Sequence, residues 1–315
     1  MWYLVGALAA LALLVFLTAL ICFFKVFYSP TRKPMGMDDY PIPDGGIYRA
    51  HREQIVNWMK EIRQMDRVPV EVTSFDGLTL RGMYYECKKG APVELLFHGY
   101  RGNAERDLSG GVERCFALGR NVILIDQRGG GSSDGHVTTF GINERLDCLT
   151  WVRFAIDFFG PDVKLVIGGV SMGAATVMMA AGEELPKNVV CVMADCGYTS
   201  AKEIISKVMV EMHLPPKLLY PFIRLGAKWF GRFDLDETSP MEAVQRSKTP
   251  IIFIHGDTDD FVPCDMSRDL YAACVSEKKL AVIHGAGHGL AYPVDKEGYL
   301  DALRQFEAEC DFFHS

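Results

Sequence analysis

A serine placed between two glycines is the first arrangement in the sequence that could do chemistry. The pattern G-x-S-x-G sets Ser171 between Gly169 and Gly173, after the apolar run 164–168 and before the alanine-rich stretch 174–182. Glycines permit a tight strand-to-helix turn, which exposes the hydroxyl and turns the N-terminus of the following helix toward a developing oxyanion. This context predicts that Ser171 is a nucleophile.

The same pattern occurs a second time, around Ser133 between Gly131 and Gly135. Ser133 follows the sequence DQRGGG and precedes HVTTFG, so it lies in a polar loop with no helix immediately after it. Because the chemistry requires the strand-to-helix context, we interpret Ser133 as part of a turn after the preceding apolar run.

The base that such a serine needs is sought among eight histidines. A serine hydroxyl is a weak nucleophile at neutral pH and requires a base within hydrogen-bonding reach, oriented by a third group. His288 lies in a glycine-containing loop after the last apolar run, at the strand end where open α/β sheets place their ligands. We therefore predict His288 as the base and assign His284 to the end of the strand.

The acid that orients this base stays open on spacing alone. The segment 255–263 follows an apolar run and carries three carboxylates, Asp257, Asp259 and Asp260. Asp195, at the end of an earlier apolar run, is a rival, because some sheets of this kind carry the acid one strand earlier. A helix cap or a solvated loop charge is the alternative role for each of the four.

The elements that must position these residues follow from the hydrophobic periodicity. Residues 48–66 have apolar side chains at helical spacing, and residues 68–87 predict an antiparallel hairpin with an Asp-Gly turn. Six short apolar runs follow, separated by segments long enough for helices: 93–97, 122–125, 164–168, 189–194, 250–254 and 280–284. Runs that are apolar throughout are typical of parallel strands covered on both faces. We expect an α/β fold with a mostly parallel, eight-stranded sheet and helices on both faces.

One interval is longer than a crossover helix requires. About 55 residues separate the run 189–194 from the run 250–254, and two stretches within the interval have helical apolar spacing, broken by prolines. We interpret residues 198–240 as a helical lid whose composition suits an apolar acyl chain. An ordinary insertion packed on the core is the alternative.

Five short motifs accompany these elements. They are His98-Gly99-Tyr100-x-Gly102-Asn103, Asp126-Gln127-Arg128-Gly129, the glycine-flanked Ser171, HGDTDDFVP at 255–263 and GAGHG at 285–289. Each motif alone is weakly specific. Together they resemble the α/β-hydrolase superfamily, in particular its membrane-anchored bacterial serine hydrolases, over roughly residues 68–312.

The resemblance implies an α/β-hydrolase fold and a catalytic triad. In the superfamily's pattern HG-x-x-D-x-x-V-P, the orienting acid is the fourth residue after the histidine, which is Asp259 in this sequence. The order Ser171, Asp259, His288 along the chain also matches the superfamily.

The resemblance also implies the groups around the triad. It places one oxyanion-binding backbone amide at Met172, directly after the nucleophile, and the other at Tyr100 in the HG loop. His98, Asp126 and Arg128 are then expected to shape the neighbouring loops rather than to take part in the chemistry.

The N-terminal segment is long enough to cross a membrane. Residues 2–24 contain no charge, and a helix of 23 residues at about 1.5 Å per residue exceeds the roughly 30 Å hydrocarbon core. A signal peptide would carry basic residues before the apolar run, and this sequence has none there. The bulky Ile21 before Cys22 argues against lipoprotein processing. A signal peptide or a buried core helix is the alternative.

The flanking residues predict the topology and the domain boundaries. The first basic side chains, Lys25, Arg32 and Lys33, follow the span, which places the C-terminal side in the cytoplasm. Prolines and a Gly-Gly pair fill the next segment. We expect a single-pass transmembrane anchor at 1–27, a linker at 28–47 and an α/β-hydrolase domain at 48–315.

Composition excludes several classes. Among 315 residues, 49% are hydrophobic and 23% charged, which argues against disorder, collagen and coiled coil. A net charge of -7 makes nucleic acid an unsuitable partner. Nine irregularly spaced cysteines without a C-x-x-C pair indicate free thiols in a reducing compartment rather than a disulfide framework or a zinc site. The sequence contains neither a G-x-x-x-x-G-K-[ST] loop nor an H-E-x-x-H pair, so we expect no cofactor.

These patterns favour a membrane-anchored serine hydrolase that cleaves a carboxylic ester or thioester of an apolar acyl substrate through an acyl-enzyme intermediate. A serine peptidase of the aminopeptidase or prolyl-oligopeptidase type is the runner-up, because the same triad and fold serve both reactions. No propeller or acidic amine-binding element is recognisable. A non-catalytic scaffold on the same fold is the third possibility, which the filled triad positions disfavour.

Overall fold

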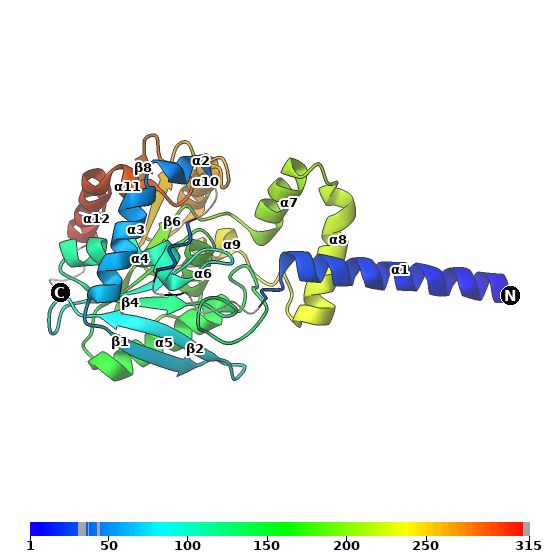
Figure 1. Cartoon of the computed structure of the whole chain (residues 1–315), viewed down its shortest axis with the longest axis horizontal. Coiled ribbons are helices and arrows are strands. Elements are labelled where there is room, and N and C mark those ends of the chain that lie inside the picture. The colour runs from blue at the N-terminus through cyan, green and yellow to red at the C-terminus, as the bar shows by residue number, and fades with distance from the viewer. Residues whose placement is uncertain (31–35, 37, 43–44, 311–315) are drawn as a thin grey trace.

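The architecture is taken from a computed structural model, which describes residues 1–30, 36, 38–42 and 45–310. An eight-stranded sheet with the order β1-β2-β4-β3-β5-β6-β7-β8 forms its centre (Figure 1). The strands are β1 (Val68–Thr73), β2 (Thr79–Tyr85), β3 (Val93–Phe97), β4 (Asn121–Asp126), β5 (Leu165–Val170), β6 (Val189–Asp195), β7 (Ile251–Gly256) and β8 (Lys278–Ile283). Only β2 runs antiparallel to its neighbours, β1 and β4. The predicted fold class is confirmed.

The central strands are apolar on both faces because each face meets a layer of helices. In β3, Leu95 packs into one core cluster together with Trp151, whereas its neighbour Leu96 packs into another together with Leu108. The first layer contains α5 (Glu144–Phe159), α6 (Met172–Ala181) and α10 (Cys264–Ala273). The second contains α3 (Arg52–Gln64), α4 (Ala104–Ala117) and α12 (Lys296–Cys310). Short helices α2 (Gly46–Arg49), α9 (Pro240–Val244) and α11 (Ala291–Val294) complete the domain.

The predicted lid segment is helical and stands away from the sheet. It consists of α7 (Ala201–Glu211), α8 (Pro216–Gly226) and a five-residue π-helix, η1 (Ala227–Gly231). The side chain of Ser200 caps α7 by accepting a hydrogen bond from the Glu203 amide. Pro216 begins α8 at a position that needs no backbone donor. The break between the two helices therefore follows from the prolines.

The apolar N-terminal segment forms one helix, α1 (Trp2–Val26), which projects from the domain beside the lid helices (Figure 1). It is the one helix among the described residues that is long and apolar enough to cross a membrane. Its C-terminal end is built into the domain: Phe27 is fully buried and its carbonyl accepts a hydrogen bond of 2.9 Å from the Thr138 amide. The Ser29 amide donates to the His136 carbonyl at 2.7 Å. The first residues of the predicted linker are thus packed structure, and its residues 31–35, 37, 43 and 44 lie outside the described residues.

Candidate active site

Ser171 occupies a sharp turn between β5 and α6. Its backbone angles, φ 57° and ψ −114°, are ones that a residue with a side chain rarely adopts. The two glycines make the turn possible. A Cβ on Gly169 would lie 2.2 Å from the Gly173 carbonyl, and a Cβ on Gly173 would lie 2.0 Å from the Phe97 carbonyl. The turn therefore requires glycine on both sides of the serine.

Three predicted side chains form one hydrogen-bonded chain. His288 Nε2 lies 3.0 Å from Ser171 Oγ, and His288 Nδ1 lies 2.7 Å from Asp259 Oδ2. Ser171 and Asp259 are buried, and the His288 side chain is 13% exposed. A hydroxyl, an imidazole and a carboxylate in this order can activate the hydroxyl as a nucleophile.

The Asp259 carboxylate is held by groups on its own loop. Its Oδ1 accepts hydrogen bonds from the amides of Phe261 at 2.9 Å and Val262 at 2.8 Å. His255 Nε2 lies 3.2 Å from Oδ2. Burial pushes the pKa of Asp259 upward, but the contacts from His255, His288 and the Val262 amide outweigh it and hold that pKa below its usual range. The carboxylate is therefore charged at neutral pH and can stabilise a protonated His288.

The alternative groups lie elsewhere. Asp257 Oδ2 is 2.7 Å from Nδ1 of His284, one residue beyond the end of β8. Asp195 accepts a hydrogen bond of 2.9 Å from the Tyr299 hydroxyl. The Ser133 hydroxyl donates to the Asp126 carbonyl at 2.5 Å and accepts from the Arg81 amide, so it fastens a turn.

The HG loop lies directly against the serine. A Cβ on Gly99 would lie 3.6 Å from Ser171 Cβ, and Tyr100 lines the same cavity as Ser171. Met172 is the first residue of α6, whose N-terminal amides have no partner within the helix. Both predicted oxyanion residues are therefore neighbours of Ser171, and their role stays a prediction.

The residues expected to shape loops make structural contacts. His98 Nε2 accepts from the Gln127 amide at 2.9 Å, which joins the loops after β3 and β4. Asp126 accepts from the Ala104 amide at 2.8 Å. The Arg128 guanidinium pairs with Asp147 at 2.6 Å.

A cavity of about 260 Å³ opens beside Ser171 and His288. Its apolar lining comes mainly from Ile55, Trp58, Leu96, Leu108, Val170 and Met193. These residues belong to the α3 and α4 side of the sheet, and no residue of α7, α8 or η1 lines this cavity. The predicted lid helices therefore do not line this cavity, whose walls come mainly from α3, α4, α11, α12 and the strands between them.

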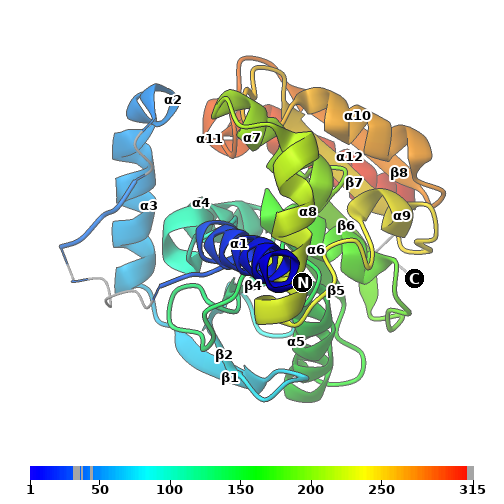
Figure 2. The ribbon, with the colours of Figure 1, turned by 90° about the vertical axis from the view of Figure 1, so that its right-hand side faces the viewer.

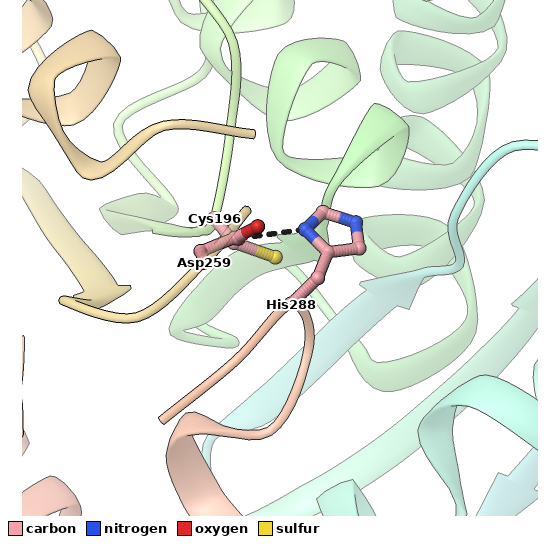
Figure 3. Close-up of side chains that lie close together, drawn as sticks. All are labelled: Cys196, Asp259 and His288. Atoms are coloured by element: carbon pink, nitrogen blue, oxygen red, sulfur yellow. Dashed lines mark hydrogen bonds and ion pairs between the residues drawn. The ribbon is translucent and has the colours of Figure 1, made fainter. Parts of the chain in front are cut away.

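Three neighbours of the triad escaped prediction. The Tyr48 hydroxyl donates to the His288 carbonyl at 3.0 Å, and the Phe261 ring lies 4.9 Å from the His288 ring. Cys196 lies beside Asp259 and His288 (Figure 3), with donor atoms of the three within 4.8 Å of one another. Cys196 could have been predicted from the sequence, because it directly follows β6 at the carboxyl edge of the sheet. Nothing in the sequence around Tyr48 indicates that it contacts the triad.

Cys196, Asp259 and His288 are also the one group among the described residues whose donor atoms could hold a metal ion. Burial raises the pKa of the Cys196 thiol well above its usual value, and the neighbouring Asp195 and Asp259 raise it further. A thiol that keeps its proton is a poor metal ligand. The arrangement therefore suits a hydrogen-bonded triad better than a metal centre.

Comparisons with known proteins identify the family and the fold. A model of the prolyl oligopeptidase family matches residues 112–310. The uncharacterized protein YqkD of Bacillus subtilis is 25% identical over 264 residues, which cover 84% of this chain and 86% of YqkD. The uncharacterized membrane protein YNL320W of Saccharomyces cerevisiae is 25% identical over 199 residues, 62% of this chain and 63% of that protein. The esterase Pf2001 of Pyrococcus furiosus shares the fold, with a TM-score of 0.66 at 23% identity over 87% of this chain and 98% of the esterase.

Proposed function

The chain belongs to the prolyl oligopeptidase family of α/β-hydrolases, and we propose that it is a membrane-anchored serine hydrolase cleaving a carboxylic ester or thioester of an apolar acyl substrate. The observation that carries this proposal is the continuous hydrogen-bonded chain from Asp259 through His288 to Ser171. Both links are short enough for proton transfer and for orientation of the imidazole.

In the proposed reaction, Ser171 Oγ attacks the substrate carbonyl carbon while His288 Nε2 takes the hydroxyl proton. Asp259 keeps the proton on Nδ1 and stabilises the imidazolium. The backbone amides of Met172 and Tyr100 donate to the oxyanion of the tetrahedral intermediate. His288 then returns its proton to the leaving alcohol or thiol, and the acyl group remains on Ser171. A water molecule deprotonated by His288 releases the acid and restores the hydroxyl.

The lining of the cavity supports an ester substrate with an apolar acyl group. Most of its side chains are aliphatic or aromatic. Of two carboxylates on its wall, Asp107 is paired with Arg106 at 2.5 Å, and Asp195 Oδ2 accepts a hydrogen bond from the Tyr299 hydroxyl at 2.9 Å. Asp195 Oδ1 has no hydrogen-bond partner in the described structure, but burial raises the pKa of this carboxyl, which disfavours the charged form that the ammonium group of a peptide would require. The family name is the observation that favours a peptidase as the second candidate.

The proposed anchor is α1. Its 25 residues exceed the length needed to cross a bilayer, and a yeast relative carries the description membrane protein. Lys25 follows the apolar run and favours a cytoplasmic catalytic domain.

A panel of p-nitrophenyl esters of graded acyl length, assayed beside aminoacyl anilides with the full-length protein in detergent, tests the substrate class. We expect turnover of esters that rises with acyl length, and little cleavage of the anilides. Preferential cleavage of the anilides would instead establish the peptidase.

A further inference from the structure

The lid helices α8 and η1 pack against α1 instead of covering the cavity beside Ser171. A Cβ on Gly226 of α8 would lie 2.6 Å from the Ala19 carbonyl of α1, so the two backbones approach as closely as small residues allow. Farther along α1, the Phe16 ring lies 5.3 Å from the Phe230 ring and 6.4 Å from the Trp229 ring. The lid thus covers one face of the C-terminal half of α1, where Ala19 and Phe23 are buried, whereas Leu17, Ile21 and Phe24 stay exposed.

This contact leaves too little free helix to cross a bilayer. The residues of α1 from Trp2 to Leu14 are exposed, and side chains become partly covered from Val15 onward. These 13 residues extend only about 20 Å, whereas the hydrocarbon core measures about 30 Å. Tilting the helix would shorten its reach further. A spanning α1 therefore carries the lid about 10 Å into the membrane, the depth typical of interfacial helices.

The outer surface of the lid has the composition that this depth requires. Its exposed apolar side chains are Val210, Met212, Leu214, Leu218 and Trp229. The segment 216–232 contains four basic residues and no acidic residue, and all four, Lys217, Arg224, Lys228 and Arg232, are exposed, although Arg224 is paired with Asp236 at 2.7 Å. Apolar side chains flanked by basic ones match the boundary between acyl chains and anionic headgroups.

We propose that residues 210–231, which comprise the end of α7, the α7–α8 connection, α8 and η1, form a lipid-embedded surface that seats the domain on an anionic bilayer. Figure 2 shows α7 and α8 on the same side of the domain as the projecting α1. The inference rests on the proposed anchoring by α1. Its partner is the bilayer itself, because the same face continues the apolar surface of the membrane helix.

Hydrogen bonds also connect α1, which packs against the lipid-embedded surface, to the loop beside the active site. The Tyr100 hydroxyl donates to the Val26 carbonyl of α1 at 2.6 Å, and Arg101 Nη2 donates to the Tyr28 carbonyl at 2.7 Å. Tyr100 in turn lines the cavity beside Ser171. The substrate class that this arrangement fits is an ester whose acyl chain is dissolved in the membrane.

Depth-dependent fluorescence quenching tests the lid directly. The full-length protein is placed in phosphatidylcholine vesicles that contain a minority of phosphatidylglycerol and carry bromine on the acyl chains near the headgroups. Trp58 and Trp151 are buried, so only Trp2 and Trp229 can meet the quencher. We expect Trp2→Phe to keep a bromine-dependent loss of emission and Trp2→Phe/Trp229→Phe to lose it. Quenching of the wild type but not of Trp2→Phe would overturn the seated lid while leaving the anchor. No quenching of the wild type would refute the anchor as well.

A matched pair of variants tests the functional consequence. Val210 on the lid and Val275 after α10 are exposed by 61% and 66%. We expect Val210→Asp to lower turnover of a long-chain ester in vesicles by about tenfold, while turnover of a short soluble ester stays unchanged. Val275→Asp should change neither. Equal activity of both variants on the vesicle substrate would contradict a lid seated in lipid.

Discussion

Oδ2 of Asp259 lies 2.7 Å from Nδ1 of His288, and no carboxylate of the loop other than Asp259 is bonded to that ring in the described structure. The carboxylate is itself oriented by two backbone amides on the same loop. The imidazole therefore presents Nε2 to Ser171 in one orientation, which is the condition for a histidine to act as a general base.

Asp259→Asn should lower turnover of a short soluble ester by about four orders of magnitude, because an amide favours the wrong tautomer of His288 while the geometry survives. Asp257→Asn is the matched control: Asp257 contacts His284, and its loss should cost little. Steady-state kinetics of both variants measure the difference. A crippling effect of Asp195→Asn, with an active Asp259→Asn, would place the orienting acid on β6.

The depressed pKa of Asp259 predicts a pH-dependent contribution to stability. Since the unfolded carboxyl has a pKa of about 3.9, the contribution is fully present above that value and is lost as the pH falls through the lower folded pKa. The difference in unfolding free energy between wild type and Asp259→Asn should therefore shrink below about pH 4. Urea unfolding in detergent at several pH values measures it, and a pH-independent difference would contradict the assigned pKa shift.

Gly173→Ala should prevent correct packing of the turn at Ser171, because the new Cβ would lie 2.0 Å from the Phe97 carbonyl. We expect a loss of at least about 2 kcal/mol in unfolding free energy, together with loss of activity. Gly46→Ala is the control, since a Cβ there meets nothing within 4 Å. Thermal unfolding of both variants measures the difference. Similar melting temperatures for Gly173→Ala and Gly46→Ala would refute the predicted clash with the Phe97 carbonyl.

Glu94 on β3 is fully buried between Arg114 at 2.5 Å and Arg120 at 2.7 Å. Glu94→Gln removes the counter-charge of the buried Arg114 and one of the counter-charges of Arg120, which keeps its ion pair with Glu307, and should cost about 3–5 kcal/mol of stability. Glu71→Gln, at an exposed site 3.9 Å from Arg81, should cost under about 1 kcal/mol. Chemical denaturation compares the two, and equal costs would show that the buried cluster contributes nothing particular.

The strands were predictable because their apolar runs are local: the run 93–97 coincides with β3, and the other five lie within one residue or two of β4 to β8. The glycine-flanked turn was predictable for the same reason. Choosing Asp259 over its neighbours required the family pattern, since three carboxylates of one loop have equivalent spacing.

Contacts between distant segments could not be predicted from periodicity. The pairing of Gly226 with Ala19 joins residues that are far apart in the chain, and each glycine or alanine looks unremarkable locally. Tyr48 reaches His288 across a similar separation. For the same reason periodicity could not predict that segments far apart in the chain, among them Trp58 of α3, Leu108 of α4 and Met193 of β6, line one cavity.

The central claim, that Ser171 is the nucleophile of a serine hydrolase, is tested most directly by covalent labelling with a fluorophosphonate probe. The probe forms a bond only with an activated serine. We predict that the wild type and Ser133→Ala are labelled equally, because the Ser133 hydroxyl only fastens a turn, and that Ser171→Ala is not labelled although it folds normally. Labelling of Ser171→Ala at the wild-type level, or its absence from the folded wild type, would contradict the account.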